Sequence, residues 1–394
     1  MSSGGKLYDL TKKKPKAIIA SIELPCGSDD LEASVEELVL LLSNLDIKTL
    51  ATTAQKRQIP DPACFIGSGK AMEIKGFAGD LGATLLVVND FLTPTQKSNL
   101  QKLTGLEVWD RTFVIMKIFE SRAHTAEAKL QVEMAQYHYE IPSLKGLGYQ
   151  MSRTGGGIGT RGPGETEFER HRRKLDKRIK SITQKLEEVR KRRKDRRERR
   201  RHNGIPLVSL VGYTNSGKST LLKALSGDGE ILSANQLFST LDTVVRKIKY
   251  RNSSGGFLLS DTVGFIRKLP PELVAAFRAT LEEVAGADLL IIVLDASDKD
   301  PVDTFDIVLD TLRGLEADTL PRITVLNKID KLDYDPSYTA VELRSRGEQV
   351  VFTSATEHRG FDELLDAVSE RLSERVFSYE WSPVNKYEDY SEFQ

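Results

Sequence analysis

The chain has 394 residues, and its 57 basic and 57 acidic residues give a formal net charge of zero. This length is long for one domain and predicts two or three. The two cysteines, Cys26 and Cys64, fit no metal-ligand spacing and argue against a disulfide framework, so we expect a reducing cytoplasm. No apolar run reaches the roughly 18 residues of a membrane span. The flexible N-terminus expected at residues 1–16 lacks the apolar segment of a signal peptide.

Residues 17–144 predict an N-terminal parallel α/β domain. Short apolar runs alternate with amphipathic stretches along this region, which is the pattern of β-α-β units around a parallel sheet. A partial phosphate-loop motif at 66–74 lacks its outer glycine, so we expect Gly67 and Gly69 to form the turn before a helix. The expected strands are 17–24, 48–54, 84–90 and 107–111, and the expected helices are 30–45 and 93–103.

A glycine-rich loop is expected at residues 145–167, because eight glycines and a proline in this segment disfavour any regular element. The next segment, 168–203, predicts one basic coiled-coil helix. Residues 170–202 hold 18 Lys and Arg against five Asp and Glu, a net charge of +13. After Val189, arginine replaces the apolar seam, so we expect the packing partner to end there and the remaining helix to be solvated. The seam residues are Leu175, Ile179, Ile182, Leu186 and Val189.

Residues 204–375 predict a doubly wound α/β domain. Apolar strands alternate with helical segments, and ligands of such sheets bind at the carboxyl ends of the strands. The tail at 376–394 is aromatic and acidic, and we expect little fixed structure in it. The expected strands are 206–212, 257–261, 288–297, 322–327 and 349–355.

The segment GYTNSGKST at 212–220 fits the phosphate-loop pattern G-x-x-x-x-G-K-[ST] in full. It follows an expected strand and precedes a helical pattern, so its backbone N–H groups are expected to hold the phosphates at a helix N-terminus. We expect Lys218 to reach the β- and γ-phosphates and the Ser219 hydroxyl to bind Mg²⁺. The expected nucleotide-binding residues of this loop are Gly212, Asn215, Ser216, Gly217, Lys218, Ser219 and Thr220.

An Asp-x-x-Gly turn follows the strand at 257–261, and we expect Asp261 to hold Mg²⁺ and the Gly264 N–H to meet the terminal phosphate. Between this turn and the phosphate loop, residues 237–248 are expected to form a mobile switch. Thr240 is our candidate to cap Mg²⁺, with Thr243 in reserve and an ordinary surface threonine as the alternative. The catalytic candidates are therefore Lys218, Thr240 and Gly264, and the metal candidates are Ser219, Thr240 and Asp261.

The motif Asn-Lys-Ile-Asp ends the next expected strand and predicts recognition of guanine. Asp330 can accept hydrogen bonds from N1 and the exocyclic amine of guanine, a donor pair that adenine lacks. Asn327 would contact the base and brace the phosphate loop, and the Lys328 stem would pack on the base. Ser354 and Ala355 follow another strand, where the Ala355 N–H would meet guanine O6. Five such loops in this order predict a Mg²⁺-dependent GTPase domain with GTP or GDP bound.

Four segments resemble the HflX family of ribosome-associated GTPases: Lys-Leu-Gln-Val-Glu at 129–133, the glycine-rich loop at 153–167, Leu-Phe-Ser-Thr-Leu-Asp at 237–242, and Asp-Thr-Val-Gly-Phe-Ile at 261–266. The resemblance implies a protein that binds the large ribosomal subunit and its ribosomal RNA. It implies that GTP binding and hydrolysis, stimulated by the ribosome, control ribosome splitting or recycling under stress.

The position after Gly264 often carries a glutamine that orients water, but here it is Phe265. The resemblance implies that a hydrophobic residue is normal there, so we expect slow intrinsic turnover that a partner completes. The chain departs from the family at Asp242-Thr243-Val244, where the family usually has Pro-Thr after Leu-Asp. We expect the loss of this proline to loosen the switch.

The basic helix predicts an RNA partner, since a run of positive charge binds phosphate backbones without reading sequence. Glycines of the preceding loop can approach RNA closely because they lack Cβ. The alternatives are a solvated charged helix and a simple hinge loop. The expected RNA-binding residues are Arg153, Gly155, Gly156, Gly157, Arg161, Arg172, Arg173 and Lys177.

Two other functions are compatible with these motifs. One is a GTPase that acts as an assembly factor for ribosomes or another RNA particle. The other is an RNA-binding module that is gated by nucleotide and does not hydrolyse it. We expect a monomer in each case.

Overall fold

The structure is a computed structural model that divides into two compact units: Met1–Ile118 with Tyr139–Arg172, and Phe119–His138 with Arg173–Gln394. This division differs from the boundaries expected at residues 144 and 167, which stay predictions. Among the described helices, none has the length and apolar character needed to span a bilayer. The residues described are 14–25, 31–152, 163–202, 204–227, 238, 244–250, 255–267, 283–333 and 336–376.

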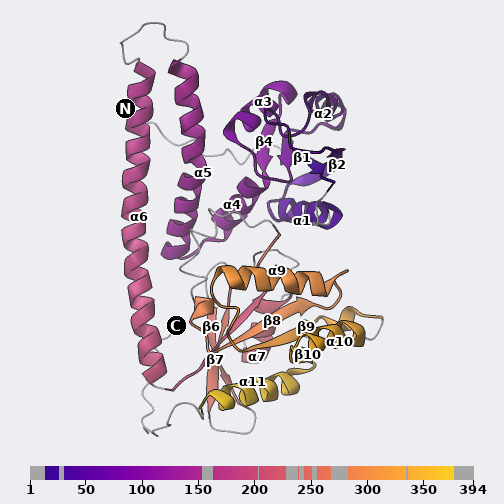
Figure 1. Ribbon diagram of the computed structural model, residues 1–394, viewed down its shortest axis with the longest axis vertical. Coiled ribbons are helices and arrows are strands. Elements are labelled where there is room, and N and C mark those ends of the chain that lie inside the picture. Colours follow the sequence, from indigo (N-terminus) through magenta and orange to yellow (C-terminus); the bar gives the residue numbers. More distant parts are fainter. Residues whose placement is uncertain are drawn as a thin grey trace. The chain divides into compact units, whose positions relative to one another are not determined.

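The first unit contains a four-stranded sheet in the order β2-β1-β3-β4, and all its neighbouring strands are parallel. This confirms the parallel α/β fold. Helices α2 and α3 cover one face of the sheet and α1 covers the other (Figure 1). Helix α2 begins directly after Gly67, as expected, but Gly69 is the second residue of the helix and not part of the turn before it. Thr93 caps α3 through a capping box with Gln96. The bounds are β1 Lys16–Glu23, α1 Leu31–Asn44, β2 Lys48–Lys56, α2 Ser68–Leu81, β3 Leu85–Val88, α3 Pro94–Thr104 and β4 Glu107–Asp110.

Three helices follow the sheet: α4 (Arg111–Arg122), α5 (Ala126–Ser152) and α6 (Pro163–His202). Helices α5 and α6 extend into residues 145–167 from both sides, so the expectation of no regular structure there is wrong at both ends. A glycine inside a helix costs only about 1 kcal/mol relative to alanine, which a long helix tolerates. Pro163 is the first residue of α6, a position where proline is compatible with a helix.

The coiled-coil seam of α6 is confirmed at Leu175, Ile182 and Leu186, whose side chains are buried. The expectation that packing ends after Val189 is wrong. Arg193 is only 19 % exposed and forms ion pairs with two glutamates. An arginine side chain can bury its stem while its guanidinium pairs with carboxylates, so the loss of apolar residues does not end the contact.

The second unit contains a six-stranded sheet in the order β10-β9-β8-β5-β7-β6, and only β6 is antiparallel to its neighbour. The doubly wound fold is thereby confirmed. Residues 244–248 belong to β6, so the C-terminal part of the predicted mobile switch is a strand. The bounds are β5 Leu207–Gly212, α7 Lys218–Ser226, β6 Val244–Lys249, β7 Gly256–Asp261, β8 Leu289–Asp295, α9 Pro301–Gly314, β9 Arg322–Asn327, a 3₁₀ turn Ile329–Lys331, α10 Ser337–Ser345, β10 Val350–Phe352 and α11 Phe361–Val376.

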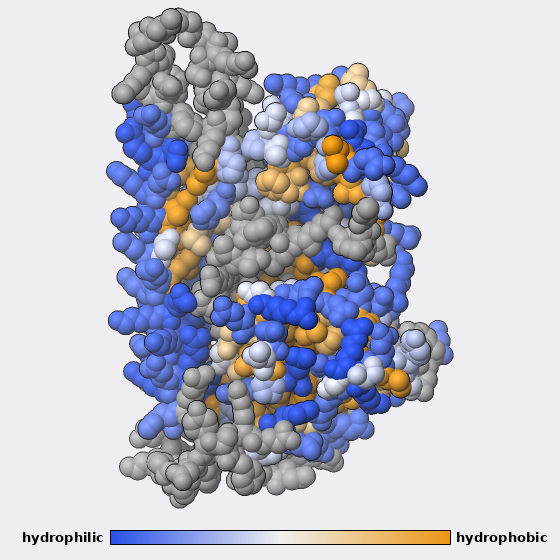
Figure 2. Space-filling model, in the orientation of Figure 1, coloured by the Kyte–Doolittle hydropathy of each residue, from blue (hydrophilic) through white to orange (hydrophobic). Residues whose placement is uncertain are grey.

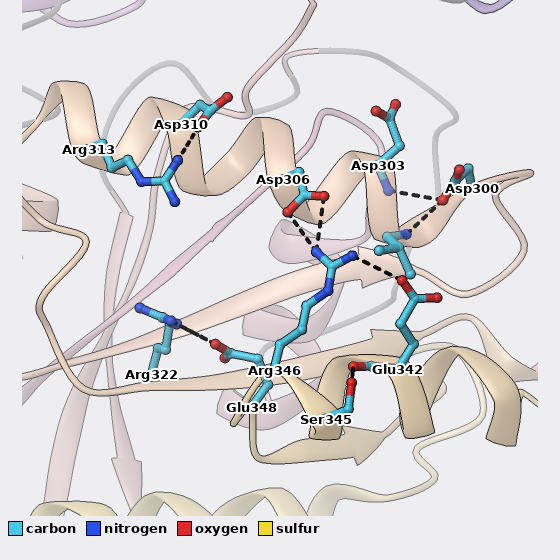
Figure 3. A network of polar contacts seen from close by, with 11 residues as sticks. Asp300, Asp303, Asp306, Asp310, Arg313, Arg322, Glu342, Ser345, Arg346 and Glu348 are labelled. Atoms are coloured by element: carbon cyan, nitrogen blue, oxygen red, sulfur yellow. Dashed lines mark hydrogen bonds and ion pairs between the residues drawn. The ribbon is translucent and has the colours of Figure 1, made fainter.

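A polar network connects α9 to α10 (Figure 3). Arg346, which follows α10, donates to both carboxylate oxygens of Asp306 at 2.8 and 3.0 Å and to Glu342 at 3.0 Å. Asp300 caps α9 by accepting from the N–H groups of Val302 and Asp303. These contacts connect α9, which packs against β8, to α10, which packs against β10; the loop after β10 is one of those expected to bind guanine.

Candidate nucleotide-binding site

The phosphate-loop segment joins β5 to α7 in a backbone conformation that requires glycine at two positions. Gly212 and Gly217 have φ angles of 147° and 97°. A Cβ on Gly217 would lie 2.2 Å from Asn327 Nδ2, and a Cβ on Gly212 would lie 2.2 Å from the Val293 carbonyl oxygen. The Asn327 amide donates to the Ser216 carbonyl at 2.9 Å, so the Asn-Lys-Ile-Asp loop braces the phosphate loop.

Lys218 is buried at the start of α7. Its ammonium group donates to the carbonyls of Gly212 and Tyr213 at 3.1 and 2.7 Å. Burial lowers the pKa of Lys218 to about 8, although the nearby Asp261 carboxylate opposes this shift and Lys328 adds to it. An anionic phosphate at this point would compensate the buried charge.

Ser219 and Asp261 meet at the carboxyl ends of β5 and β7. The Ser219 hydroxyl donates to Asp261 Oδ2 at 2.5 Å, and Asp261 is buried. A hydroxyl and a carboxylate are oxygen ligands of the kind that Mg²⁺ prefers, usually with substrate phosphates and water as the remaining ligands. The described residues contain no cluster of three His, Cys, Asp or Glu, and a Mg²⁺ ion shared with nucleotide needs none. The donor set therefore fits Mg²⁺.

Gly264 lies close to the phosphate loop. A Cβ on Gly264 would lie 2.9 Å from Thr214 Cγ2 and 3.0 Å from Lys218 Nζ. The next residue, Phe265, has a buried ring. Its backbone is hydrogen-bonded to the phosphate loop: the Phe265 N–H donates to the Gly212 carbonyl at 3.0 Å, and the Thr214 N–H donates to the Phe265 carbonyl at 2.8 Å. The side chain at this position thus has no polar atom to orient water.

The loops expected to bind guanine converge at the ends of β9 and β10. Ser354 donates its hydroxyl to Asp330 Oδ1 at 2.5 Å, which fixes the carboxylate. The Ala355 N–H donates to Asn327 Oδ1 at 3.1 Å, so guanine O6 has a competing acceptor for this N–H. Lys328 adopts a left-handed conformation, with φ of 65°.

Asp295 and Thr214 belong to the site although neither was predicted from the sequence. Asp295, the last residue of β8, accepts from Lys328 Nζ at 2.6 Å and so orients the lysine that was expected to pack on the base. Its place at a strand end could have identified it. The hydroxyls of Thr214 and Ser216 are buried and make no hydrogen bond to any described residue. Buried hydroxyls normally have partners, which fits a loop whose ligand would supply them.

Several predicted residues cannot be placed in this site. Thr240 and its reserve Thr243 lie outside the described residues, as do Arg153, Arg161 and the glycines 155–157. The other expected RNA-binding residues are described: Arg172, Arg173 and Lys177 are exposed on α6. Asn215, which has φ of 63°, and Thr220 complete the phosphate-loop region.

Comparison with known proteins gives three family matches along the chain. Residues 32–120 match the GTP-binding GTPase N-terminal family, 122–200 match the GTP-binding GTPase middle region, and 207–328 match the 50S ribosome-binding GTPase family. A protein of Caldanaerobacter subterraneus subsp. tengcongensis, GTPase HflX, is 43 % identical over 94 % of this chain and 83 % of its own length. GTPase HflX of Escherichia coli is 41 % identical over 88 % of this chain and 80 % of its own. The crystal structure of SsGBP in complex with GDP is similar, with a TM-score of 0.50 and 25 % identity over 92 % of this chain and 99 % of that one.

Proposed function

The chain belongs to the HflX family of GTPases, and we propose that it acts on the large ribosomal subunit, where GTP binding and hydrolysis control the splitting or recycling of ribosomes under stress. As a member of this family it is a GTPase, which converts GTP to GDP and phosphate. The description of the family matched by its GTPase domain supports the choice of subunit. We propose that it works as a monomer in the cytoplasm.

The observation that carries the proposal is the exposed basic surface of α6, a helix of 40 residues. Residues along this helix are predominantly hydrophilic (Figure 2). Arg173, Lys177 and Lys180 are exposed on it, and the segment 170–202 has the net charge of +13 noted above. Such a surface binds RNA phosphates by releasing counterions. Arg172 and the loop residues Arg153, Gly155–Gly157 and Arg161 are proposed to extend the same RNA contact.

The nucleotide site is proposed to work through residues that converge on the strand ends. Lys218, whose ammonium group donates to the Gly212 and Tyr213 carbonyls, would bind the phosphates of GTP together with the phosphate-loop N–H groups. Asp330 would recognise guanine while Ser354 holds its carboxylate. GDP in the SsGBP complex supports binding of a guanine nucleotide here.

Mg²⁺ would be held by Ser219, Asp261 and Thr240. When bound, it would neutralise negative charge on the phosphates. Gly264 would place its N–H beside the terminal phosphate, and a Cβ at this position would lie 2.9 Å from Thr214 Cγ2 and 3.0 Å from Lys218 Nζ. The buried ring of Phe265 cannot orient a water molecule, so a group from the partner would complete hydrolysis.

Sedimentation with isolated ribosomal subunits tests the choice of partner. The full chain, loaded with a non-hydrolysable GTP analogue or with GDP, is centrifuged with large or small subunits. We expect it to sediment with large subunits, more strongly with the GTP analogue, and to remain free with small subunits. Equal binding to both subunits would contradict the proposal. Preference for incomplete large subunits over complete ones would favour the assembly-factor alternative.

A further inference from the structure

The Asp-x-x-Gly turn is a one-residue β-bulge between two paired segments. At the end of β7, Asp261 pairs with Leu210 of β5. Beyond the turn, Phe265 pairs with Tyr213. The chain advances four residues on the β7 side but three on the β5 side, so the turn contains one extra residue. Bulges of this kind are common beside active sites, where they redirect the chain.

Hydrogen bonds hold the bulge at both ends. Before Gly264, the Thr262 hydroxyl donates to the Leu210 carbonyl at 2.7 Å. After it, the Phe265 backbone is hydrogen-bonded to the phosphate loop, as described above. The bulge brings Gly264 so close to this loop that a Cβ would lie 3.0 Å from Lys218 Nζ. The position of the Gly264 N–H therefore depends on how firmly the residues after it are held.

Tyr213, the second residue of the phosphate loop, holds the residues after the turn with its side chain. Its hydroxyl accepts a hydrogen bond from the Arg267 N–H at 2.7 Å. The Tyr213 carbonyl accepts from Lys218 Nζ, also at 2.7 Å. One half-buried residue thus contacts both the phosphate-loop lysine and the segment that follows Gly264.

A second contact holds the same segment through the Arg267 side chain. The guanidinium pairs at 2.7 Å with Asp303, which lies in the first turn of α9 (Figure 3). The Arg267 side chain is 18 % exposed, but that of Asp303 is 48 % exposed. A half-exposed ion pair contributes little by itself, so we expect the Tyr213 hydroxyl to be the stronger of the two contacts.

We propose that Tyr213 is a positioning residue for GTP hydrolysis. Through the Arg267 N–H, its hydroxyl keeps the bulge against the phosphate loop, so that the Gly264 N–H is held beside the terminal phosphate. Asp303 assists by holding the Arg267 guanidinium. The inference rests on the role proposed above for the Gly264 N–H and is independent of the ribosome.

The variant Tyr213→Phe/Asp303→Asn removes both contacts but keeps the aromatic ring and the backbone. One hydrogen bond of this kind corresponds to about a two- to tenfold effect. We therefore expect single-turnover hydrolysis of bound GTP by the isolated full chain to slow by about tenfold, with most of the loss present in Tyr213→Phe alone. Affinities for GDP and for a non-hydrolysable GTP analogue should stay within about twofold, because the lost contact acts on the chemical step.

The matched control is Tyr250→Phe/Asp310→Asn. It also removes one phenol hydroxyl and one carboxylate charge, from a tyrosine that packs against Phe257 and from an exposed ion pair with Arg313 on the same helix α9. We expect the control to hydrolyse GTP at the parent rate. A double variant as fast as the control would overturn the inference. A loss of nucleotide affinity as large as the loss of rate would also overturn it, because that result is expected if Tyr213 only supports the phosphate loop.

Amide-resolved hydrogen exchange tests the contact without any measurement of activity. The Arg267 amide loses its acceptor in Tyr213→Phe and should exchange about tenfold faster than in the parent protein. The Phe265 amide keeps the Gly212 carbonyl and should change less. Unchanged exchange at Arg267 would contradict the inference.

Gly264→Ala separates this inference from the proposed function. If Gly264→Ala hydrolyses GTP slowly and Tyr213→Phe/Asp303→Asn does not, the inference alone fails. If Gly264→Ala hydrolyses GTP at the parent rate, the proposed role of the Gly264 N–H fails, and the inference fails with it. Slow hydrolysis by both variants, with nucleotide affinity retained, is the result we expect.

Discussion

The Phe265 N–H donates to the Gly212 carbonyl at 3.0 Å, which ties the residue after the Asp-x-x-Gly turn to the first residue of the phosphate loop. This contact is made by backbone atoms, so it does not depend on the side chain. The ring itself is buried and non-polar. Phe265 therefore contributes packing and a fixed turn, and its ring offers no group for chemistry.

Phe265→Ala should separate stability from catalysis. Removing a buried phenylalanine ring should lower the free energy of unfolding by about 3–5 kcal/mol. Both backbone hydrogen bonds survive, so single-turnover GTP hydrolysis by the isolated variant should change less than about threefold. The rate is measured at a temperature where circular dichroism shows the variant folded. A large loss of turnover in folded, GTP-bound variant would show that the ring has a catalytic role.

Gly264→Ala should block hydrolysis while nucleotide binding survives. The new Cβ would lie 2.9 Å from Thr214 Cγ2 and 3.0 Å from Lys218 Nζ, so the turn or these neighbours must shift and the Gly264 N–H loses its position. Loss of one positioned hydrogen-bond donor typically lowers the rate of the chemical step by about a hundredfold or more. Gly314→Ala is the control, because its Cβ would meet nothing within 4 Å. Equal turnover of the two variants would refute the role of Gly264.

Nucleotide affinity should fall as the pH rises through about 8, the pKa of buried Lys218. Phosphate favours the charged ammonium and raises this pKa again, so binding takes up a proton above pH 8 and weakens by up to about tenfold per pH unit. The affinity for a fluorescent GDP analogue is measured from pH 7 to pH 9. Lys218→Met should lose this slope, which controls for titration of the base. A flat profile in the parent protein would contradict the assignment.

The same pKa has the opposite effect on the stability of the nucleotide-free protein. Lys218 has a pKa of about 8 when folded against an ordinary value of 10.5, so the unfolded chain binds more protons between these values. Stability from this group should therefore rise with pH across that window and be lowest below pH 8.

The sequence predicted the central strands well because their signal is local. Strand β8 consists of consecutive apolar residues followed by Asp295, and all but Asp295 are buried, as expected for a strand covered on both faces. The edge strand β6 was missed, because among its six residues only Ile248 is buried and its pattern matches a surface loop. Edge strands lack the continuous apolar run that identifies central ones.

The site was predictable where a motif has a fixed order, as in the loops that carry Lys218 and Asp330. Contacts between distant segments were not. Asp295 and Lys328 are brought together only by the neighbouring ends of β8 and β9. The sequence predicted a solvated Arg193, because the two glutamates that pair with it are distant from it in the sequence.

Neutralising exposed charges on α6 should weaken RNA binding and its dependence on salt. Arg173→Gln/Lys177→Gln removes two positive charges from the exposed surface of α6. If both contact phosphates, the slope of log affinity against log salt should fall by about two. Lys102→Gln, at an exposed position of α3, serves as a single-charge control. An unchanged slope for large-subunit binding would place the RNA contact elsewhere.

The most direct measurement of the central claim is GTP turnover by the purified chain alone and with large subunits, small subunits or whole ribosomes. The buried, non-polar ring of Phe265 predicts slow turnover alone and strong stimulation by large subunits and whole ribosomes, with little from small subunits. Fast turnover by the isolated protein, unaffected by any particle, would contradict a partner-completed site on the large subunit.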